Sequence, residues 1–158
     1  MLTEMTGDIL NVKDGIICHQ VNYFGVMGGG VAAAIAENIL TQDQYNAYTI
    51  YCKQAGRTAL GTVQFLGCSD GLIVANMFCQ DDARAKDAFS ADGITDYDCM
   101  RRCFIHVRSM ARLQRKRVYI PRNIGCGIAG GDWETAKSIM QDVFDNCSVE
   151  AFIVARKG

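Results

Sequence analysis

The chain has 158 residues, which suits one compact domain with its own core and is too short for two domains of ordinary size. Its 16 Lys and Arg residues nearly balance 17 Asp and Glu residues, so no basic excess indicates nucleic-acid binding. No apolar run approaches the roughly 20 residues that span a bilayer, and the N-terminus reads as a strand rather than a secretion signal. We therefore expect a single domain over residues 1–158, cytoplasmic and without a membrane partner.

Short apolar runs and helical periodicity alternate along the first half of the chain. In chain order they predict two strands, two helices joined by a short polar turn, and two more strands, at residues 2–5, 15–18, 30–39, 42–54, 61–67 and 71–78. The turn residues Cys68, Ser69 and Asp70 separate the last two strands and favour a hairpin. Antiparallel pairing there would make the sheet mixed.

The second half begins with a predicted surface loop at residues 80–93, which holds four aspartates and has little periodicity. The clearest helix pattern spans residues 96–114, where apolar positions recur at helical spacing and arginines lie mostly on the other side, as a solvated face. A strand at 117–120, a helix at 133–145 and a strand at 149–155 follow. Strands alternating with helices predict a three-layer α/β/α sandwich with a central mixed sheet.

Eight cysteines are scattered along the chain, mostly among apolar residues. No Cys-x-x-Cys pair occurs, and Cys99 with Cys103 lacks the second pair that a zinc site would need. We expect reduced, buried thiols that pack as small hydrophobes, and we expect no metal and no other cofactor.

Two glycine-rich loops follow predicted strands and lead into predicted helices. The first runs from His19 through Asn22 and three consecutive glycines into a helix that starts near Val31; the second is PRNIGCGIAGGDW, ahead of the helix at Trp133. Glycines let backbone N–H groups approach an anion, and a helix start adds unpaired N–H donors and the positive end of a dipole. In α/β sheets ligands bind at such strand ends, so two loops of this kind indicate a diphosphate.

A dinucleotide-binding Rossmann domain is an alternative, because Gly125-x-Gly127-x-x-Gly130 matches its fingerprint. That fold expects an acidic residue at the end of the next strand, roughly 20 residues on. After the first loop those residues are predicted helix, and after the second loop Glu150 opens a strand. Neither glycine run continues into Lys-Ser or Lys-Thr, so a nucleotide triphosphatase loop does not fit either.

Three segments together resemble the macrodomain family, the α/β/α modules that bind ADP-ribose. They are GDIL at 7–10, CHQVNYFGVMGGGVAAAI at 18–35 and IPRNIGCGIAGGDW at 120–133, and in order and spacing they extend over the whole chain. The resemblance implies that Asp8 accepts a hydrogen bond from the adenine amino group beside the backbone of Ile9, and that Asn22 bonds the distal ribose. It also implies that backbone amides of both loops hold the diphosphate. These amides belong to Gly28, Gly29, Gly30, Val31, Gly125, Cys126, Gly127, Ile128 and Ala129.

Differences from the family pattern bear on the reaction. Many macrodomains carry Asn-Ala-Ala-Asn where this chain has histidine as the first of four residues, 19–22, and many carry an aromatic residue at the position of Ala129. With histidine at this position and three glycines close behind, the first loop resembles that of the small phosphatases that act on ADP-ribose 1″-phosphate. The second loop is similar to the branch that hydrolyses ADP-ribose from glutamate side chains or nucleic acid. That branch uses a lysine after the strand at 71–78, whereas the first lysine here is Lys86.

Three functions remain open from the sequence: an enzyme that hydrolyses an ADP-ribose derivative, with phosphate removal favoured; a module that binds ADP-ribose or an ADP-ribosylated macromolecule without turnover; and, more remotely, a Rossmann oxidoreductase. For an enzyme, His19 is the expected acid or nucleophile, because imidazole titrates near neutral pH. Asp132 is expected to orient water or substrate while it caps its helix. Phe78, Phe152 or Ile153 could pack against adenine, and His106 is expected to be a bystander.

Overall fold

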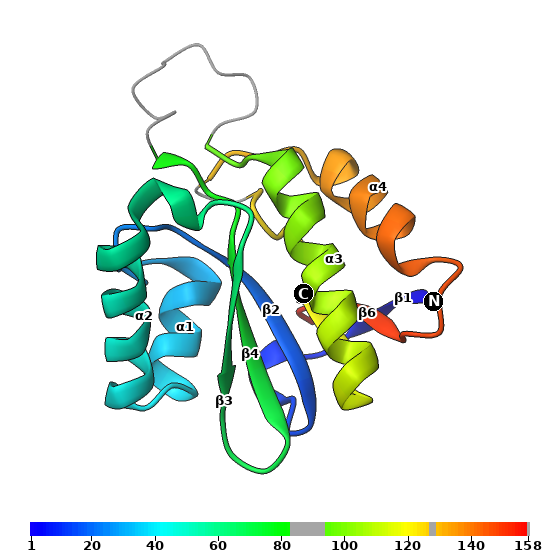
Figure 1. Cartoon of the computed structure of the whole chain (residues 1–158). Coiled ribbons are helices and arrows are strands. Elements are labelled where there is room, and N and C mark those ends of the chain that lie inside the picture. Colours follow the sequence, from blue (N-terminus) through cyan, green and yellow to red (C-terminus); the bar gives the residue numbers. More distant parts are fainter. Residues whose placement is uncertain (83–93, 127–128, 158) are drawn as a thin grey trace.

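A computed structural model describes residues 1–82, 94–126 and 129–157 (Figure 1). In chain order its elements are β1 (Leu2–Thr6), η1 (Ile9–Asn11), β2 (Gly15–Val21), α1 (Gly30–Asn38), α2 (Gln42–Ala55), η2 (Gly56–Ala59), β3 (Val63–Gly67), β4 (Leu72–Phe78), α3 (Tyr97–Gln114), β5 (Val118–Pro121), α4 (Trp133–Phe144) and β6 (Ala151–Ala155). Each predicted strand and helix is present. Most of the loop predicted at 80–93 lies outside the described residues.

The six strands form one mixed sheet in the order β1-β6-β5-β2-β4-β3. All neighbours pair in parallel except β3 and β4, which pair antiparallel through the predicted hairpin. The prediction of an α/β fold with a mixed sheet is thus confirmed. Because the central strands are parallel, the carboxyl ends of β2, β4 and β5 lie at the same edge, where ligands are expected.

Helices cover both faces of the sheet, α1 and α2 on one side and α3 and α4 on the other (Figure 1). The core under α3 and α4 includes Phe104 and Phe144, which are fully buried and meet edge to face with ring centroids 5.8 Å apart. On the opposite face, Ile17 of β2 packs with Ile35 of α1. The glycine loops therefore emerge from a sheet that is fixed from both sides.

Strand β2 is longer than predicted, because it continues through His19 and Gln20 to Val21. All seven of its residues pair in parallel with β4, from Gly15 with Leu72 to Val21 with Phe78. Polar residues at 19 and 20 made this end resemble a loop. Successive side chains of a strand point to opposite faces, so this extension sends His19 and Gln20 to opposite sides of the sheet.

Three helices begin with side-chain caps that satisfy their first N–H groups. Thr41 opens α2 with a capping box shared with Gln44, Asp96 accepts from Cys99 N at the start of α3, and Asp132 accepts from Thr135 N at the start of α4. These caps fix where each helix starts.

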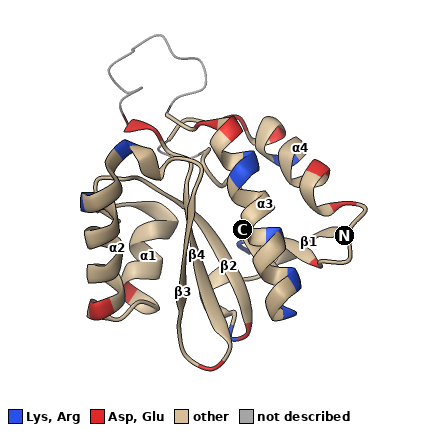
Figure 2. Cartoon of the chain, in the orientation of Figure 1, with Lys and Arg blue, Asp and Glu red and all other residues tan. Residues whose placement is uncertain are grey.

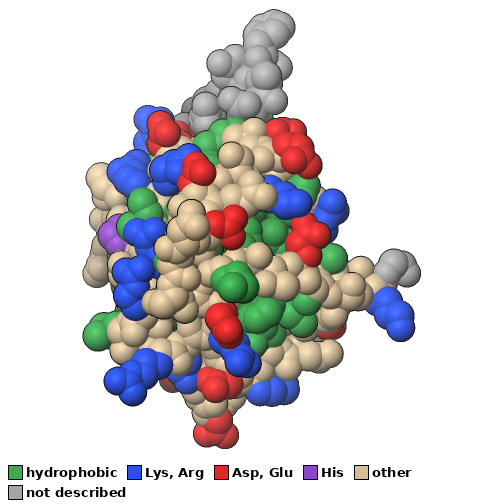
Figure 3. Space-filling model, turned by 90° about the vertical axis from the view of Figure 1, so that its right-hand side faces the viewer, with side chains coloured by type: hydrophobic (Ala, Val, Ile, Leu, Met, Phe, Trp, Pro, Cys, Tyr) green, Lys and Arg blue, Asp and Glu red, His purple; other side chains and the backbone are tan. Residues whose placement is uncertain are grey.

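The arginine-rich side of α3 is exposed, as predicted (Figure 2). Arg101 pairs with Asp142 of α4 at 3.1 Å, and positive and negative side chains are interspersed over this side of the molecule (Figure 3). All eight cysteines are unpaired; five are buried and Cys68, Cys126 and Cys147 are partly exposed. None of the helices in the described part of the chain is both long and apolar enough to cross a membrane.

Candidate functional site

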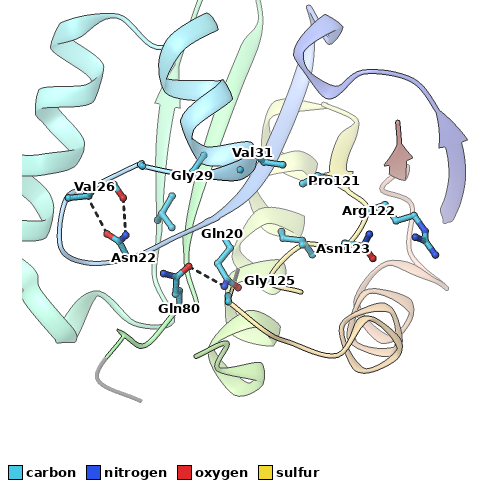
Figure 4. Close-up of a pocket in the computed structure, with 16 residues that line it drawn as sticks. Gln20, Asn22, Val26, Gly29, Val31, Gln80, Pro121, Arg122, Asn123 and Gly125 are labelled. Carbon is cyan, nitrogen blue, oxygen red and sulfur yellow. Dashed lines mark hydrogen bonds between the residues drawn. The ribbon is translucent and has the colours of Figure 1, made fainter. Parts of the chain in front are cut away.

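A cavity of about 510 Å³ opens at the carboxyl ends of β2 and β5, between the two glycine loops (Figure 4). This volume lies in the range of roughly 300–1,000 Å³ typical of small-molecule sites. The described residues that line it are Gln20, Val21, Asn22, Val26, Gly28 to Ala32, Gln80, Pro121 to Gly125 and Ala129. The two loops predicted to hold a ligand therefore do face one shared space.

The N-terminus of α1 forms one wall of this cavity and has no side-chain cap. Its N-cap residue is Gly29, and no described residue accepts a hydrogen bond from the N–H groups of Gly30, Val31 or Ala32. Unpaired N–H groups and the positive end of the helix dipole favour an anion at this position. Among the α-helices that the structure describes, α1 is the one with an uncapped start.

Asn22 folds the first loop instead of pointing freely into the cavity. Its Oδ1 accepts from the N–H groups of Phe24 (3.0 Å) and Val26 (3.4 Å), and its Nδ2 donates to Val26 O at 2.8 Å (Figure 4). The Tyr48 hydroxyl also lies 3.0 Å from Oδ1. Most of the amide is therefore already bonded, and one Nδ2 hydrogen remains for a ligand.

The second loop turns sharply after β5. Gly125 has a φ of +70°, and a Cβ there would be 2.7 Å from Gln20 Oε1, so a larger residue would strain the backbone and displace the Gln20 side chain. The N–H of Cys126 donates to Asn123 O at 2.8 Å. This N–H is already paired within its own turn, which argues against the expectation that it binds phosphate. Gly127 and Ile128 lie outside the described residues.

Gln20 and Gln80 form a polar floor that sequence reasoning missed. Gln20 Nε2 lies 3.1 Å from Thr95 Oγ1 and 3.5 Å from Gln80 Oε1, and Thr95 donates to Gly125 O at 2.6 Å. Gln80 donates in turn to Asp82 at 2.7 Å. These contacts join residues up to 75 positions apart, which a single sequence does not reveal.

Arg122 supplies the cationic side chain of the described lining, and sequence reasoning missed it too. Its guanidinium carbon lies 5.4 Å from the centroid of the Trp133 ring, which is a cation–π geometry. Figure 4 shows Pro121, Arg122 and Asn123 at the end of the cavity opposite Asn22 and Gln80. The cavity is thus elongated, with the α1 N-terminus between its two ends.

Comparisons with known proteins agree with this architecture. The chain is 26% identical over 147 residues to an ADP-ribose 1″-phosphate phosphatase from Candida albicans, an alignment that includes 90% of this chain and 89% of that protein. A protein of unknown function from Bacteroides thetaiotaomicron superposes with a TM-score of 0.82 at 26% identity, over 98% of each chain. The macrodomain of Mycobacterium tuberculosis DarG superposes with a TM-score of 0.79 at 22% identity, over 100% of this chain and 99% of that one. This chain has the macrodomain fold. No model of a protein family matches it.

His19 does not line the described cavity, which argues against the predicted catalytic role. Its side chain is 1% exposed, and its Nε2 lies 2.5 Å from Asn76 Oδ1. Asn76 Nδ2 donates to Gln64, so its Oδ1 is the acceptor and Nε2 carries the proton. The other ring nitrogen, Nδ1, is buried without a partner. Burial lowers the pKa of His19 to about 4, partly offset by the bond to Asn76, so the ring is neutral at pH 7.

We expect His19 to make the stability of this protein depend on pH. Its pKa falls from an ordinary 6.5 to about 4 on folding, so the stabilisation is complete above pH 6.5 and is lost as pH falls toward 4. The loss should reach about 3 kcal/mol. Urea unfolding between pH 7 and 4.5 measures it: His19→Leu should flatten the decline, whereas His106→Gln, at an exposed position of α3, should not. An equal decline in wild type and His19→Leu would show that His19 is not the titrating group.

The other predicted residues are placed as follows. Asp132 is exposed, caps α4 through Thr135 N and Oγ1, and does not line the described cavity, so its structural role is the one observed. Asp8 caps η1 by accepting from Leu10 N at 3.0 Å, and Ile9 is buried beside it. Neither lines the described cavity.

The three candidates for adenine packing also lie outside the described lining. Phe78 is fully buried between Tyr48 and Tyr51, and Ile153 is in the core. Phe152 stacks on Tyr119, with ring centroids 5.4 Å apart. All three therefore act in packing.

The charge of the cavity lining suits an anion. In the described part of the chain no Asp, Glu, His, Cys or Lys lines it, and the charged residue of the lining is Arg122, whose side chain points outward over Trp133 (Figure 4). Cys126 is nearby in the second loop, but burial and the charge of Asp132 raise the pKa of its thiol to about 11, so it is not a thiolate at pH 7. Within residues 1–82, 94–126 and 129–157, no three His, Cys, Asp or Glu side chains gather as a metal site would require.

Proposed function

We propose that this macrodomain binds ADP-ribose or a derivative of it, with the diphosphate over the N-terminus of α1. The observation that carries this proposal is the uncapped helix start, which presents three N–H groups to a cavity whose described lining has no carboxylate. Gly125 and Ala129 face the same space from the second loop. The similarity to an ADP-ribose 1″-phosphate phosphatase supports this choice of ligand.

The elongated cavity has two ends, to which we assign the adenine and the distal ribose of the ligand. We place adenine at the Pro121 and Arg122 end, where Asp8 and Ile9 of the adjoining η1 would contact its edge. The distal ribose goes to the opposite end, with Asn22, Gln20 and Gln80. Asn22 contributes its remaining Nδ2 hydrogen and the shape of the loop that it holds together.

The reaction that we propose is hydrolysis of ADP-ribose 1″-phosphate. Water attacks the terminal phosphorus and a new P–O bond forms, while the bond from phosphorus to the ribose 1″-oxygen breaks. The 1″-oxygen takes up the proton that the water releases, and the products are ADP-ribose and inorganic phosphate. Because the described lining holds no acid or base, this chain would act by positioning the substrate and by stabilising charge with loop N–H groups. The side-chain amides of Gln20 and Gln80 would orient the attacking water. We also place this activity in the cytosol.

One observation favours a second function, a module that binds ADP-ribose or an ADP-ribosylated macromolecule without turnover. General acids and bases are His, Asp, Glu, Lys, Cys or Tyr side chains, and none is present in the described lining. Incubating the purified protein with ADP-ribose 1″-phosphate, ADP-ribosylated protein and ADP-ribosylated DNA separates the possibilities. Phosphate release from the first substrate supports the phosphatase, ADP-ribose release from either polymer supports a hydrolase, and tight binding without turnover supports the module.

We expect ADP-ribose to protect the fold against unfolding. The cavity lies at the end of a sheet that is packed on both faces, so we expect binding to need little rearrangement. At a ligand concentration about a hundred times the dissociation constant, the free energy of unfolding should rise by roughly 2.7 kcal/mol. Urea unfolding with and without ADP-ribose measures this difference, and the absence of any shift at millimolar ligand would refute the proposed function.

A further inference from the structure

A second hollow of about 510 Å³ lies on the other side of the first loop, against α2 and η2. Nothing in the proposed function uses it. The residues that carry the argument below are Tyr23, Phe24, Ile50, Lys53 and Arg57. A hollow as large as the first cavity is large enough for a small organic ligand.

The hollow adjoins the Asn22 and Gln80 end of the first cavity through a buried carboxylate. Tyr23 follows Asn22, and Asp81 follows Gln80 along the chain. The Tyr23 hydroxyl donates to Asp81 Oδ1 at 2.8 Å, and the Arg57 guanidinium reaches Asp81 Oδ2 at 2.8 Å. The Asp81 side chain is 3% exposed, so it anchors two walls of the hollow from beneath.

One wall of the hollow is apolar and aromatic although it faces solvent. Phe24 is 64% exposed, Ile50 of α2 is also exposed, and the Phe24 ring lies 4.9 Å from that of Tyr23. An exposed Phe face beside a hollow is a surface on which a planar ring can stack.

The rest of the lining supplies positive charge. The Arg57 side chain is 67% exposed, so it presents the remainder of its guanidinium while Asp81 fixes one edge. Lys53 is exposed and has no partner among the described residues. No Asp or Glu lines the hollow in the described part of the chain. Cations next to an aromatic face match the two parts of a nucleotide, its phosphate and its base.

We propose that this hollow is a second ligand site, which binds a nucleotide with its base against Phe24 and its phosphate at Lys53 and Arg57. The nucleotide is either free or one unit of a nucleic-acid strand, since both offer the same base and phosphate. The proposal does not rest on the function of the first cavity.

Titration with thymidine 5′-monophosphate, followed by calorimetry, tests the site. Phe24→Ala should lower the affinity at least about fivefold, the low end of what one base stack contributes. Lys53→Ala should lower it at least about fivefold as well, because it removes a charged contact to the phosphate. Matched controls are Leu113→Ala, at an exposed apolar position of α3, and Lys13→Ala, at an exposed position before β2; neither should change the affinity. Gly29→Val alters the first cavity and should leave this binding intact, so failure of one site is distinguishable from failure of the other.

A second arm identifies the source of the nucleotide. If an eight-residue thymidine oligonucleotide binds more tightly than the monophosphate, and with the same dependence on Phe24, the site receives a strand; equal affinities indicate a free nucleotide. The proposal fails if neither ligand binds saturably, or if binding is unchanged in Phe24→Ala and Lys53→Ala. It also fails if hexaglutamate displaces the nucleotide with equal affinity, since that outcome indicates an acidic peptide.

Discussion

Replacing Gly29 with valine should abolish binding of ADP-ribose and leave the protein folded. Gly29 has φ −150° and ψ 162°, an extended conformation that valine adopts without strain. The residue lines the cavity at the N-cap of α1, so a branched side chain there would stand between a ligand and the three unpaired N–H groups of the helix. We expect affinity to fall at least about a hundredfold, equivalent to roughly 2.7 kcal/mol. Isothermal calorimetry with ADP-ribose measures it.

The matched control for this change is Gly67→Val. Gly67 ends β3, is exposed, and would have no atom within 4 Å of an added Cβ. The Gly67→Val variant should bind ADP-ribose as the wild type does. Retention of affinity in Gly29→Val to within about threefold would show that the anion does not lie over the start of α1.

Removing the Phe104 side chain should have the largest effect on stability. Phe104 is fully buried in α3, packs edge to face on Phe144, and belongs to the core between α3, α4 and the sheet. Phe104→Ala should lower the free energy of unfolding by about 3–5 kcal/mol, because it loses burial and leaves a cavity. For a domain of this size the melting temperature should fall roughly 2–4 °C for each kcal/mol.

Leu113→Ala in the same helix is the control for this change. Leu113 is 76% exposed, so its truncation should change the free energy of unfolding by no more than about 0.5 kcal/mol. Urea unfolding of both variants measures the contrast. If both variants lost a similar free energy of unfolding, burial of Phe104 would not be the cause of its loss.

Much of the fold could be predicted because local patterns determine it. Helix starts at Thr41, Asp96 and Asp132 carry side chains that cap, and the turn residues at 68–70 gave the antiparallel hairpin. The main error was the end of β2. His19 and Gln20 are polar, yet both belong to a strand, since each pairs with a residue of β4 far along the chain. Pairing between distant segments has no local signal.

The site was predicted in position but not in detail. The glycines made both loops visible in the sequence, because a turn with positive φ, as at Gly30 and Gly125, favours glycine. The side chains that line the cavity depend on which face of a strand they occupy. One step along β2 separates Gln20, which faces the cavity, from His19, which is buried against Asn76. Sequence reasoning selected His19 for its reactive side chain, and this side chain lies on the face of β2 opposite to that of Gln20.

The uncapped N-terminus of α1 also sets stability against ligand binding. A serine or aspartate at position 29 would cap the helix as Thr41, Asp96 and Asp132 cap the others, and relative to glycine this adds a few tenths of a kcal/mol to the stability. The same side chain would occupy the position proposed for the anion at the start of α1, and the charge of an aspartate would repel the anion. Selection of variants for thermal stability alone would therefore favour such replacements and yield stable variants that no longer bind the ligand. A screen for more stable variants must therefore select for ligand binding at the same time.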